Sequence, residues 1–282
     1  MDIVIISAFV SATITMLINY FKITYSASVI YRYEEKREIR KFVVRHHGYL
    51  VRYTSNMSYR LFNMYSNKNR CWLDVGKKYS SNNYYYNSTL YRFMCVIACI
   101  YQVDQESLIM NTKVAEKKDL LFLNYSEAIH WVMTDTALFE GLDYNNYEQS
   151  CHFFSDKLRE YGALCVNEDK VVSMDIFLKH INHESGIGPV LDYFDGIELD
   201  ENNFKWDRLV VLHLILLAFL NEYGYRRHRS DDKVFLEVAG KINNIQVLTN
   251  FVEWIPKLDL NNNKEIRKIM CAYEKLPRVK RI

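Results

Sequence analysis

An uninterrupted apolar segment near the N-terminus constrains this chain more than any other feature. Residues 3–18 read IVIISAFVSATITMLI without a charge, and Tyr20 and Phe21 extend the run before Lys22. Close to twenty residues, at about 1.5 Å rise per residue, match the roughly 30 Å hydrocarbon core of a bilayer. The sequence therefore predicts a transmembrane helix, in which Tyr20, Phe21 and Tyr25 form an aromatic belt at the interface.

The side chains expected to anchor this helix in lipid are its large apolar ones, namely Ile3, Val4, Ile5, Ile6, Phe9, Val10, Ile14, Leu17, Ile18 and Phe21. A cleavable signal peptide is an alternative, because Ser26-Ala27-Ser28 resembles a cleavage site. Such peptides start with basic residues, however, and this sequence starts with Met-Asp. A buried core helix is a third interpretation, which the length of the run disfavours. We expect a membrane anchor over residues 1–22.

Charges on the two sides of the anchor predict its orientation. Asp2 precedes the apolar run, whereas six basic residues follow it: Arg32, Lys36, Arg37, Arg40, Lys41 and Arg45. Basic flanks remain in the cytoplasm, so the N-terminus is expected outside and the rest of the chain inside. The predicted location is the inner (cytoplasmic) membrane, crossed once, with the lipid bilayer as a partner and a cytoplasmic C-terminal domain.

The composition favours a helical protein. The 282 residues include only 9 Gly and 3 Pro, and residues that interrupt helices are therefore scarce. The expected fold class is mainly α, with the transmembrane helix continuing into a helical stalk over residues 23–65. A bundle-like helical cytoplasmic domain is expected to follow over residues 66–282.

The stalk has the charge pattern of an exposed helix. Over residues 34–45, glutamates are interleaved with lysines and arginines at i,i+3 and i,i+4 spacing, and an apolar stripe follows from Leu50 to Met64. The anchor is therefore expected to continue into one long helix, with Gly48 as its weak point.

Residues 66–88 are polar and are expected to form a loop, and Asn167-Glu168-Asp169 between valines favours a short hairpin. The apolar run that follows Arg208 is too short to span a bilayer, so it predicts a buried core helix in which His213 is a hydrogen-bonded core residue. The segments with a helical pattern are Thr89 to Gln105, Glu127 to Phe139, Glu148 to Leu164, Arg208 to Tyr223, Ile245 to Trp254 and Lys264 to Tyr273.

Charge and cysteine usage exclude some classes of protein. The net charge of +2 is too small to indicate a nucleic-acid partner. The six cysteines are scattered, have apolar neighbours and form no CxxC, which indicates core thiols in a reducing compartment. Acidic residues over 192–201 lack the spacing of a calcium loop, so a solvated loop is expected there.

One cluster has the residue types of a metal site. His180, His183 and Glu184 fall together, and two histidines three apart on a helix are able to share a face and bind a metal. The spacing is not that of H-E-x-x-H or H-x-x-E-H, and no third ligand follows in an obvious position. The alternative is a pair of surface histidines at a helix end.

A second cluster has the residue types of an anion site. Arg226, Arg227, His228 and Arg229 come directly after the predicted core helix. These side chains suit a phosphate, a small anionic ligand or anionic lipid headgroups. Cations also interact favourably with the negative end of the helix dipole without binding anything.

The sequence contains no motif of a known catalytic centre. It has no glycine-rich phosphate loop, no nucleophile elbow and no kinase signature. We therefore assign no catalytic residue, expect no cofactor, and lean away from an enzyme.

Two segments carry a resemblance. Residues 55–64, SNMSYRLFNM, resemble a helix of the form LQSRLYNIL, and residues 87–106 resemble ESTLYLFGQYFAWVEILRRE. Both helices occur in a group of uncharacterised bacterial proteins with one N-terminal transmembrane helix and a helical cytoplasmic domain. The likeness covers about residues 1–130 and departs from the group at residues 99–102, CIYQ, where Trp and Glu are usual. It implies fold and location, and no activity.

This architecture predicts a membrane-anchored sensor or effector of a bacterial regulatory or anti-phage defence system. Such a protein would act by oligomerisation, or by binding a ligand or a protein partner through its helical domain. One alternative is a non-enzymatic membrane scaffold that recruits a soluble partner. A second alternative is an enzyme with a non-standard site.

Overall fold

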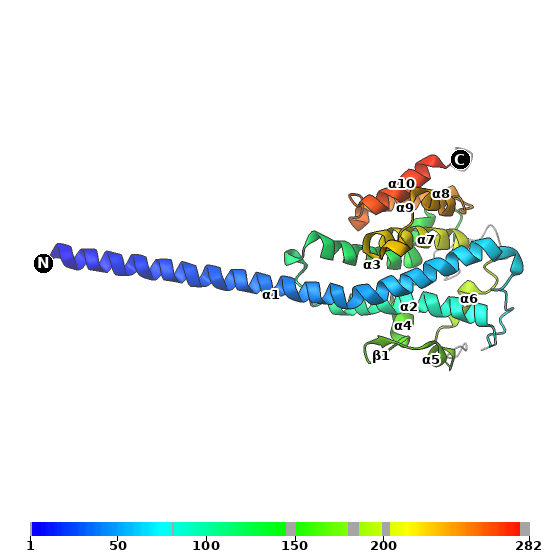
Figure 1. The fold of residues 1–282 in the computed structure, drawn as a ribbon, viewed down its shortest axis with the longest axis horizontal. Coiled ribbons are helices and arrows are strands. Elements are labelled where there is room, and N and C mark those ends of the chain that lie inside the picture. The colour runs from blue at the N-terminus through cyan, green and yellow to red at the C-terminus, as the bar shows by residue number, and fades with distance from the viewer. Residues whose placement is uncertain (1, 81, 145–150, 180–185, 199–203, 277–282) are drawn as a thin grey trace.

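The computed structural model describes residues 2–80, 82–144, 151–179, 186–198 and 204–276, with side chains from Ile5 onward. It confirms the predicted mainly α fold: a long N-terminal helix leads into a helical body that carries one two-stranded sheet (Figure 1).

Helix α1 spans Asp2–Asn67 and combines the predicted anchor and stalk without a break. Its first half projects from the body, and its first buried apolar residue is Ile39 (Figure 1). The N-terminal part is long and apolar enough to cross a membrane, and none of it is covered by the rest of the chain. Gly48 leaves the helix intact because the flanking turns pack against the body through Phe42 and Leu50.

The remaining elements follow the predicted order, with shifted boundaries. Helix α3 begins at Lys117, ten residues before the predicted start, because Leu120 to Tyr125 continue its buried side. Its predicted last turn is a separate 3-10 helix. The bounds are η1 Lys68–Arg70, α2 Tyr84–Ser107, η2 Thr112–Val114, α3 Lys117–Thr134, η3 Thr136–Phe139, α4 Ser155–Leu164, β1 Val166–Asn167, β2 Lys170–Val171, α5 Met174–Lys179, α6 Gly188–Phe194, α7 Phe204–Tyr223, η5 Arg226–His228, α8 Asp232–Ala239, α9 Ile245–Trp254, η6 Ile255–Leu258 and α10 Lys264–Lys275.

Helix α7 is the centre of the body. It contacts α1, α3, α8, α9 and α10, and its apolar run is buried on every side, as the sequence predicted. In Figure 1, α8 to α10 lie on one side of α7, whereas α2 packs along α1 and carries α4, α5 and the hairpin on its other side. The molecule therefore consists of one long projecting helix, α1, whose second half packs against both α2 and the central helix α7 of the body.

The predicted hairpin is present. Val166 pairs with Val171 and Asn167 with Lys170 in an antiparallel register. Glu168 and Asp169 between them have φ angles of 47° and 60°, the left-handed conformation that a two-residue hairpin turn requires at both positions.

The described part of the acidic segment, residues 192–198, is not a solvated loop, and for that part the expectation was wrong; residues 199–201 lie outside the described residues. Both carboxylate oxygens of Asp195 accept hydrogen bonds from backbone amides, Val75 N at 2.8 Å and Lys77 N at 2.6 Å. Glu198 accepts from the amide of Leu73. These carboxylates satisfy backbone donors of the long connection between η1 and α2, which has few regular hydrogen bonds of its own, and they fix it to the body.

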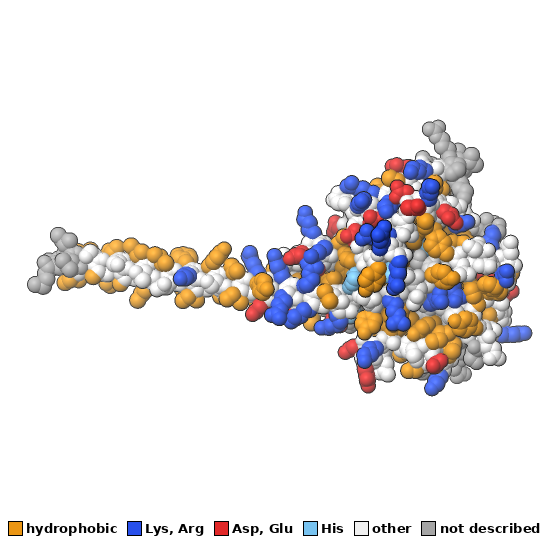
Figure 2. Space-filling model, viewed as in Figure 1, with side chains coloured by type: hydrophobic (Ala, Val, Ile, Leu, Met, Phe, Trp, Pro, Cys, Tyr) orange, Lys and Arg blue, Asp and Glu red, His pale blue; other side chains and the backbone are white. Residues whose placement is uncertain are grey.

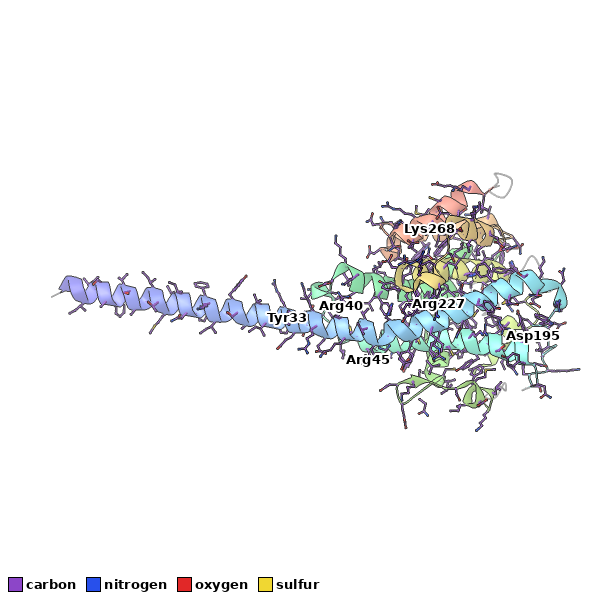
Figure 3. All side chains as sticks on the ribbon, viewed as in Figure 1. Tyr33, Arg40, Arg45, Asp195, Arg227 and Lys268 are labelled. Carbon is purple, nitrogen blue, oxygen red and sulfur yellow. The ribbon has the colours of Figure 1, made fainter. Side chains whose placement is uncertain are left out.

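Ion pairs join α1 to the body at the point where the helix enters it. Arg40 pairs with Glu116 at 2.7 Å and with Asp119 at 2.9 Å, and Arg45 pairs with Glu106 at 2.7 Å. Figure 3 shows Arg40 and Arg45 on successive turns of this part of α1. The Asp119 side chain is buried, so this contact fixes the entry of α1 more firmly than a surface pair would.

Candidate functional site

The predicted metal cluster lies outside the part of the chain that the structure describes. His180, His183 and Glu184 fall in the segment 180–185. Among the described residues, no group of three or more histidine, cysteine, aspartate or glutamate side chains is placed to hold a metal ion.

The predicted anion cluster forms a short exposed 3-10 helix at the end of α7. Arg226 and Arg227 project into solvent, and Arg227 Nε donates to His228 Nε2 at 3.2 Å. Burial and the charge of Arg227 lower the pKa of His228, so it is neutral at pH 7. None of the arginines of the cluster, including Arg229, forms an ion pair with a carboxylate of the described residues. The cluster is therefore an open, uncompensated positive surface without enclosing walls.

Glycine at the end of α7 allows the chain to turn into this cluster. A Cβ atom on Gly224 would lie 2.4 Å from the carbonyl oxygen of Leu220, so no larger residue fits. The turn brings the Tyr223 carbonyl to His47 of α1, whose Nε2 donates to it at 2.9 Å. Because His47 follows Phe21 by 26 residues, about 39 Å of helix separates the cluster from the anchor. Figure 3 also places Arg227 farther from the anchor than Arg40.

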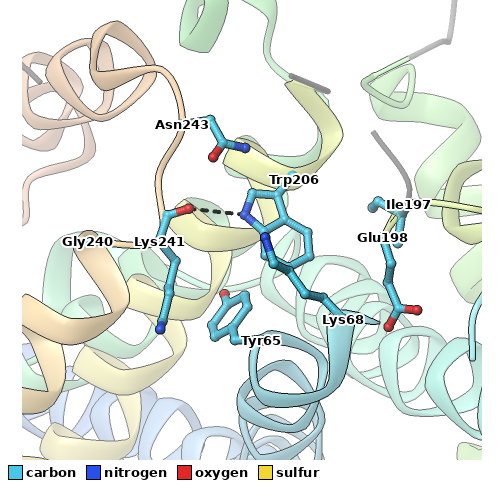
Figure 4. Close-up of a pocket in the computed structure, with 8 residues that line it drawn as sticks. All are labelled: Tyr65, Lys68, Ile197, Glu198, Trp206, Gly240, Lys241 and Asn243. Carbon is cyan, nitrogen blue, oxygen red and sulfur yellow. Dashed lines mark hydrogen bonds between the residues drawn. The ribbon is translucent and has the colours of Figure 1, made fainter. Parts of the chain in front are cut away.

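A small cavity of about 240 Å³ lies between the end of α1, the start of α7 and the turn after α8. Figure 4 shows Trp206 at its centre, with Lys241 and Glu198 on opposite sides, and the Trp206 indole donates to the Lys241 carbonyl at 3.1 Å. Burial raises the pKa of Glu198, and its Oε1 has no hydrogen-bond partner among the described residues. Glu198 is followed directly by residues 199–203, which the structure does not describe.

A larger cleft of about 660 Å³ lies between the last turns of α2, the middle of α3 and α4. Its lining combines apolar side chains with a few polar and charged ones, which is the usual character of a site for a small molecule. The lining residues are Val103, Asp104, Gln105, Ser107, Leu108, Thr112, Leu120, Leu123, Asn124, Ser126, Glu127, His130 and Arg159.

Two buried side chains of α3 face this cleft with unused hydrogen-bonding atoms. Ser126 is 1% exposed and His130 is 7% exposed, and they lie one helical turn apart. Neither Ser126 Oγ nor His130 Nε2 has a partner among the described residues. Buried polar atoms in folded proteins are almost always hydrogen-bonded, because an unpaired one costs about 1–3 kcal/mol. These two atoms are therefore candidates for direct contact with a ligand.

Burial in the wall of the cleft keeps His130 neutral at pH 7. Burial is the main cause that lowers its pKa, and the nearby Arg159 guanidinium lowers it further, whereas Asp104, Asp156 and the Ser155 carbonyl oppose the shift. Arg159 pairs with Asp104 at 2.8 Å and donates to Ser155 Oγ at 2.8 Å, which fixes α4 against α2 at the cleft. In a neutral imidazole one nitrogen donates and the other accepts, so the tautomer decides which of the two His130 Nε2 would do toward a ligand.

Ser126 and His130 do not form the hydrogen-bonded pair of an activated serine nucleophile in this structure. Such a nucleophile is activated by a hydrogen bond to its base, and neither Ser126 Oγ nor His130 Nε2 has a partner among the described residues. Sequence reasoning missed both residues: the predicted helix began at residue 127 and left out Ser126, and His130 lay inside it without a recognisable motif. The one signal they gave was a polar pair at i,i+4 spacing within an apolar run.

Comparison with known proteins adds no relative. No family model matches this chain, and neither a curated protein nor a solved structure matches it.

Proposed function

We propose that this protein is a membrane-anchored sensor or effector of a bacterial regulatory or anti-phage defence system, with its helical body in the cytoplasm. The observation that carries the proposal is the form of α1: an apolar half that nothing in the chain covers, continuous with a half that is part of the core. A ligand or partner of the body would thereby be coupled to the membrane through a single helix. The basic residues after the anchor support the orientation.

The cleft between α2, α3 and α4 is the proposed ligand site. Helix α2, which contributes one wall, is packed along α1 over much of its length. A molecule that bridges α2 and α3 through Ser126 and His130 would bias how these helices pack against α1. A sensor requires that its ligand bind one packing arrangement of these helices more tightly than another.

The effector form of the proposal predicts an anchor-dependent effect on cells. Overexpression of the full chain is expected to depolarise the inner membrane, as read by a potential-sensitive dye, and deletion of residues 3–21 is expected to abolish toxicity. The deletion removes the only part of α1 that matches the bilayer core and leaves the buried half of the helix intact. An anchor-deleted protein that stays fully toxic at the same expression level would contradict the effector role.

A scaffold that recruits a soluble partner is the second candidate, and the open arginine cluster at η5 favours it. Its unpaired guanidinium groups suit an acidic surface of a partner protein. This candidate predicts a stably co-purifying protein that is lost when Arg226 and Arg227 are replaced by glutamate, and no toxicity on overexpression.

The unpaired serine of the cleft provides a test of the ligand site. Ser126→Ala removes a buried hydroxyl without a partner, so we expect the free energy of unfolding to stay level or rise by about 1 kcal/mol while biological activity falls. The matched control is Ser58→Ala, because the Ser58 hydroxyl is equally buried but lies 2.9 Å from His213 Nε2. That control is expected to lose about 1–3 kcal/mol.

Urea unfolding of the detergent-solubilised full chain, followed by circular dichroism, measures both variants. A Ser126→Ala variant that is destabilised as much as the Ser58→Ala control would show that Ser126 has a structural partner, and would remove it from the ligand site.

A further inference from the structure

The exposed apolar surface of α1 extends well beyond the predicted end of the anchor. After Lys22, six large apolar side chains remain exposed before the body begins: Ile23, Tyr25, Val29, Ile30, Tyr31 and Tyr33. From Ile3 to Tyr33 the helix is about 46 Å long at 1.5 Å per residue. That length matches a whole bilayer with its headgroup layers, roughly 40–45 Å, rather than the hydrocarbon core alone.

This length fixes where the body meets the membrane. If the helix crosses both headgroup layers, Arg32, Lys36 and Arg37 lie at the cytoplasmic headgroup surface, and Lys22 extends its side chain from below toward the same layer. Figure 2 shows basic side chains gathered around the base of the projecting helix. The body begins within the next turn or two of α1, so its end faces the lipid directly.

The end of the body at this level is the connection between α2 and α3. Arg40 of α1 is paired with Glu116 and Asp119, which places the start of α3 beside the first turns of α1 in the body. The connection presents Leu108, 79% exposed, and Ile109, 90% exposed, which are the two most exposed large apolar side chains among the described residues.

Three lysines follow these two apolar side chains in the chain, Lys113 in η2 and Lys117 and Lys118 in the first turn of α3. Lys113 and Lys117 form no ion pair with a carboxylate of the described residues, and Lys118 pairs only loosely with Glu116, at 3.8 Å. The acidic groups next to this connection are already paired: Glu116 and Asp119 with Arg40, Glu106 with Arg45, and Asp104 with Arg159. Two highly exposed apolar side chains followed closely in the chain by three lysines, two of them without an ion pair among the described residues, are complementary to an anionic lipid surface.

We propose that the α2–α3 connection docks on the anionic cytoplasmic leaflet, with Leu108 and Ile109 inserted at the boundary between headgroups and acyl chains and with Lys113, Lys117 and Lys118 on the headgroups. The inference rests on the proposed membrane placement of α1. It has a further consequence for the cleft, because Leu108 also lines it. Docking therefore holds the cleft next to the membrane surface. Binding of a ligand in the cleft would change how tightly the connection binds lipid, and lipid binding would change the affinity of the cleft for its ligand.

The test uses the full chain reconstituted into vesicles, with Cys71 and Cys271 replaced by serine because both are exposed. A solvatochromic fluorophore is attached at Ile109→Cys, and the matched control carries it at Leu164→Cys, an exposed apolar position on α4. In phosphatidylcholine vesicles that contain phosphatidylserine, we expect the label at 109 to shift to the blue and to be quenched several-fold more than the label at 164 by a lipid-attached quencher. Salt and Lys113→Glu/Lys117→Glu/Lys118→Glu are expected to reverse the shift.

Flotation of the same vesicles separates the two levels of the proposal. If the protein does not float with lipid, the membrane placement of α1 is wrong. If it floats and the labels at 109 and 164 remain equally solvent-exposed, docking of the α2–α3 connection is wrong. An equal shift in neutral and anionic vesicles would overturn the role of the lysines and of anionic lipid.

Discussion

Replacing Arg208 with alanine is expected to destabilise the body by about 3–5 kcal/mol, which is the largest effect that we predict for a single side chain. Arg208 is completely buried in the first half of α7. Its Nη1 donates to the carbonyl of Val132, and its Nη2 donates to the carbonyl of Asp135 at 2.9 Å. Its guanidinium lies 4.5 Å from the centre of the Phe139 ring.

The reason for this effect is the end of α3. The last carbonyls of a helix have no partner within it, and here they are buried, so they require a donor from elsewhere in the protein. Arg208 supplies two donors from a different element and joins α3, η3 and α7 at one point. Alanine leaves both carbonyls unpaired and opens a cavity, and both changes cost free energy.

Two variants distinguish this account from a general effect of charge. Arg208→Lys retains the charge but lacks the fork of donors that reaches both carbonyls, so it is expected to lose most of the same stability. Arg159→Ala removes a half-exposed ion pair with Asp104, so it is expected to lose less than about 1 kcal/mol. Urea unfolding of the detergent-solubilised chain measures all three. A loss for Arg208→Ala no greater than that for Arg159→Ala would refute the structural role.

Acidification from pH 7 to pH 5 is expected to reduce the free energy of unfolding by about 2 kcal/mol through His213 alone. This residue is fully buried on α7, where its ring nitrogens lie 2.9 Å from the Ser58 hydroxyl and 3.3 Å from the Tyr65 hydroxyl. Burial lowers its pKa from an ordinary value of 6.5 to about 3.

The direction of the effect follows from which state binds the proton. Between pH 6.5 and pH 3 the unfolded chain binds a proton at this histidine and the folded chain does not, so lowering the pH favours unfolding. Above pH 7 both states are neutral there and the effect disappears. His152, whose pKa burial lowers to about 4, adds to the loss in the same pH range.

The matched variant is His213→Phe, which cannot be protonated and fits a site where rings of Phe62 and Tyr65 already contact the imidazole. The variant is expected to be less stable at pH 7, because Ser58 loses a partner, but to lose about 2 kcal/mol less than the native chain on going to pH 5. Unfolding curves at the two pH values give this difference. An unchanged pH dependence would mean that His213 does not govern the acid sensitivity.

The elements that the sequence predicted well are those with strong, local patterns. The continuity of α1, the buried run of α7 and the Glu168-Asp169 turn each follow from spacing within a few residues. His213 was also predicted correctly, because a polar residue within a wholly apolar run needs a hydrogen-bond partner in the core.

The features that escaped prediction depend on contacts between distant segments. Asp195 was expected in water because its own neighbours are acidic, and its role comes from amides some 120 residues earlier. Ser126 and His130 belong to no sequence motif. They are candidates because one buried atom of each, Ser126 Oγ and His130 Nε2, has no hydrogen-bond partner among the described residues. Side chains of this kind are recognised as candidate ligand contacts only when the packing of α2, α3 and α4 is known.

If α1 crosses a bilayer as proposed, its continuity also sets a rotational relation between the membrane and the body. Each residue of an α-helix turns the chain by about 100°, so one residue inserted between Tyr25 and Tyr33 would rotate the body by about 100° relative to the lipid-facing side of the anchor and lift it by only 1.5 Å. Seven inserted residues would nearly restore the angle while lifting the body by about 10 Å. Insertions of different length in this one exposed segment would thus change either mainly the rotation of the body about the helix axis or mainly its height above the bilayer.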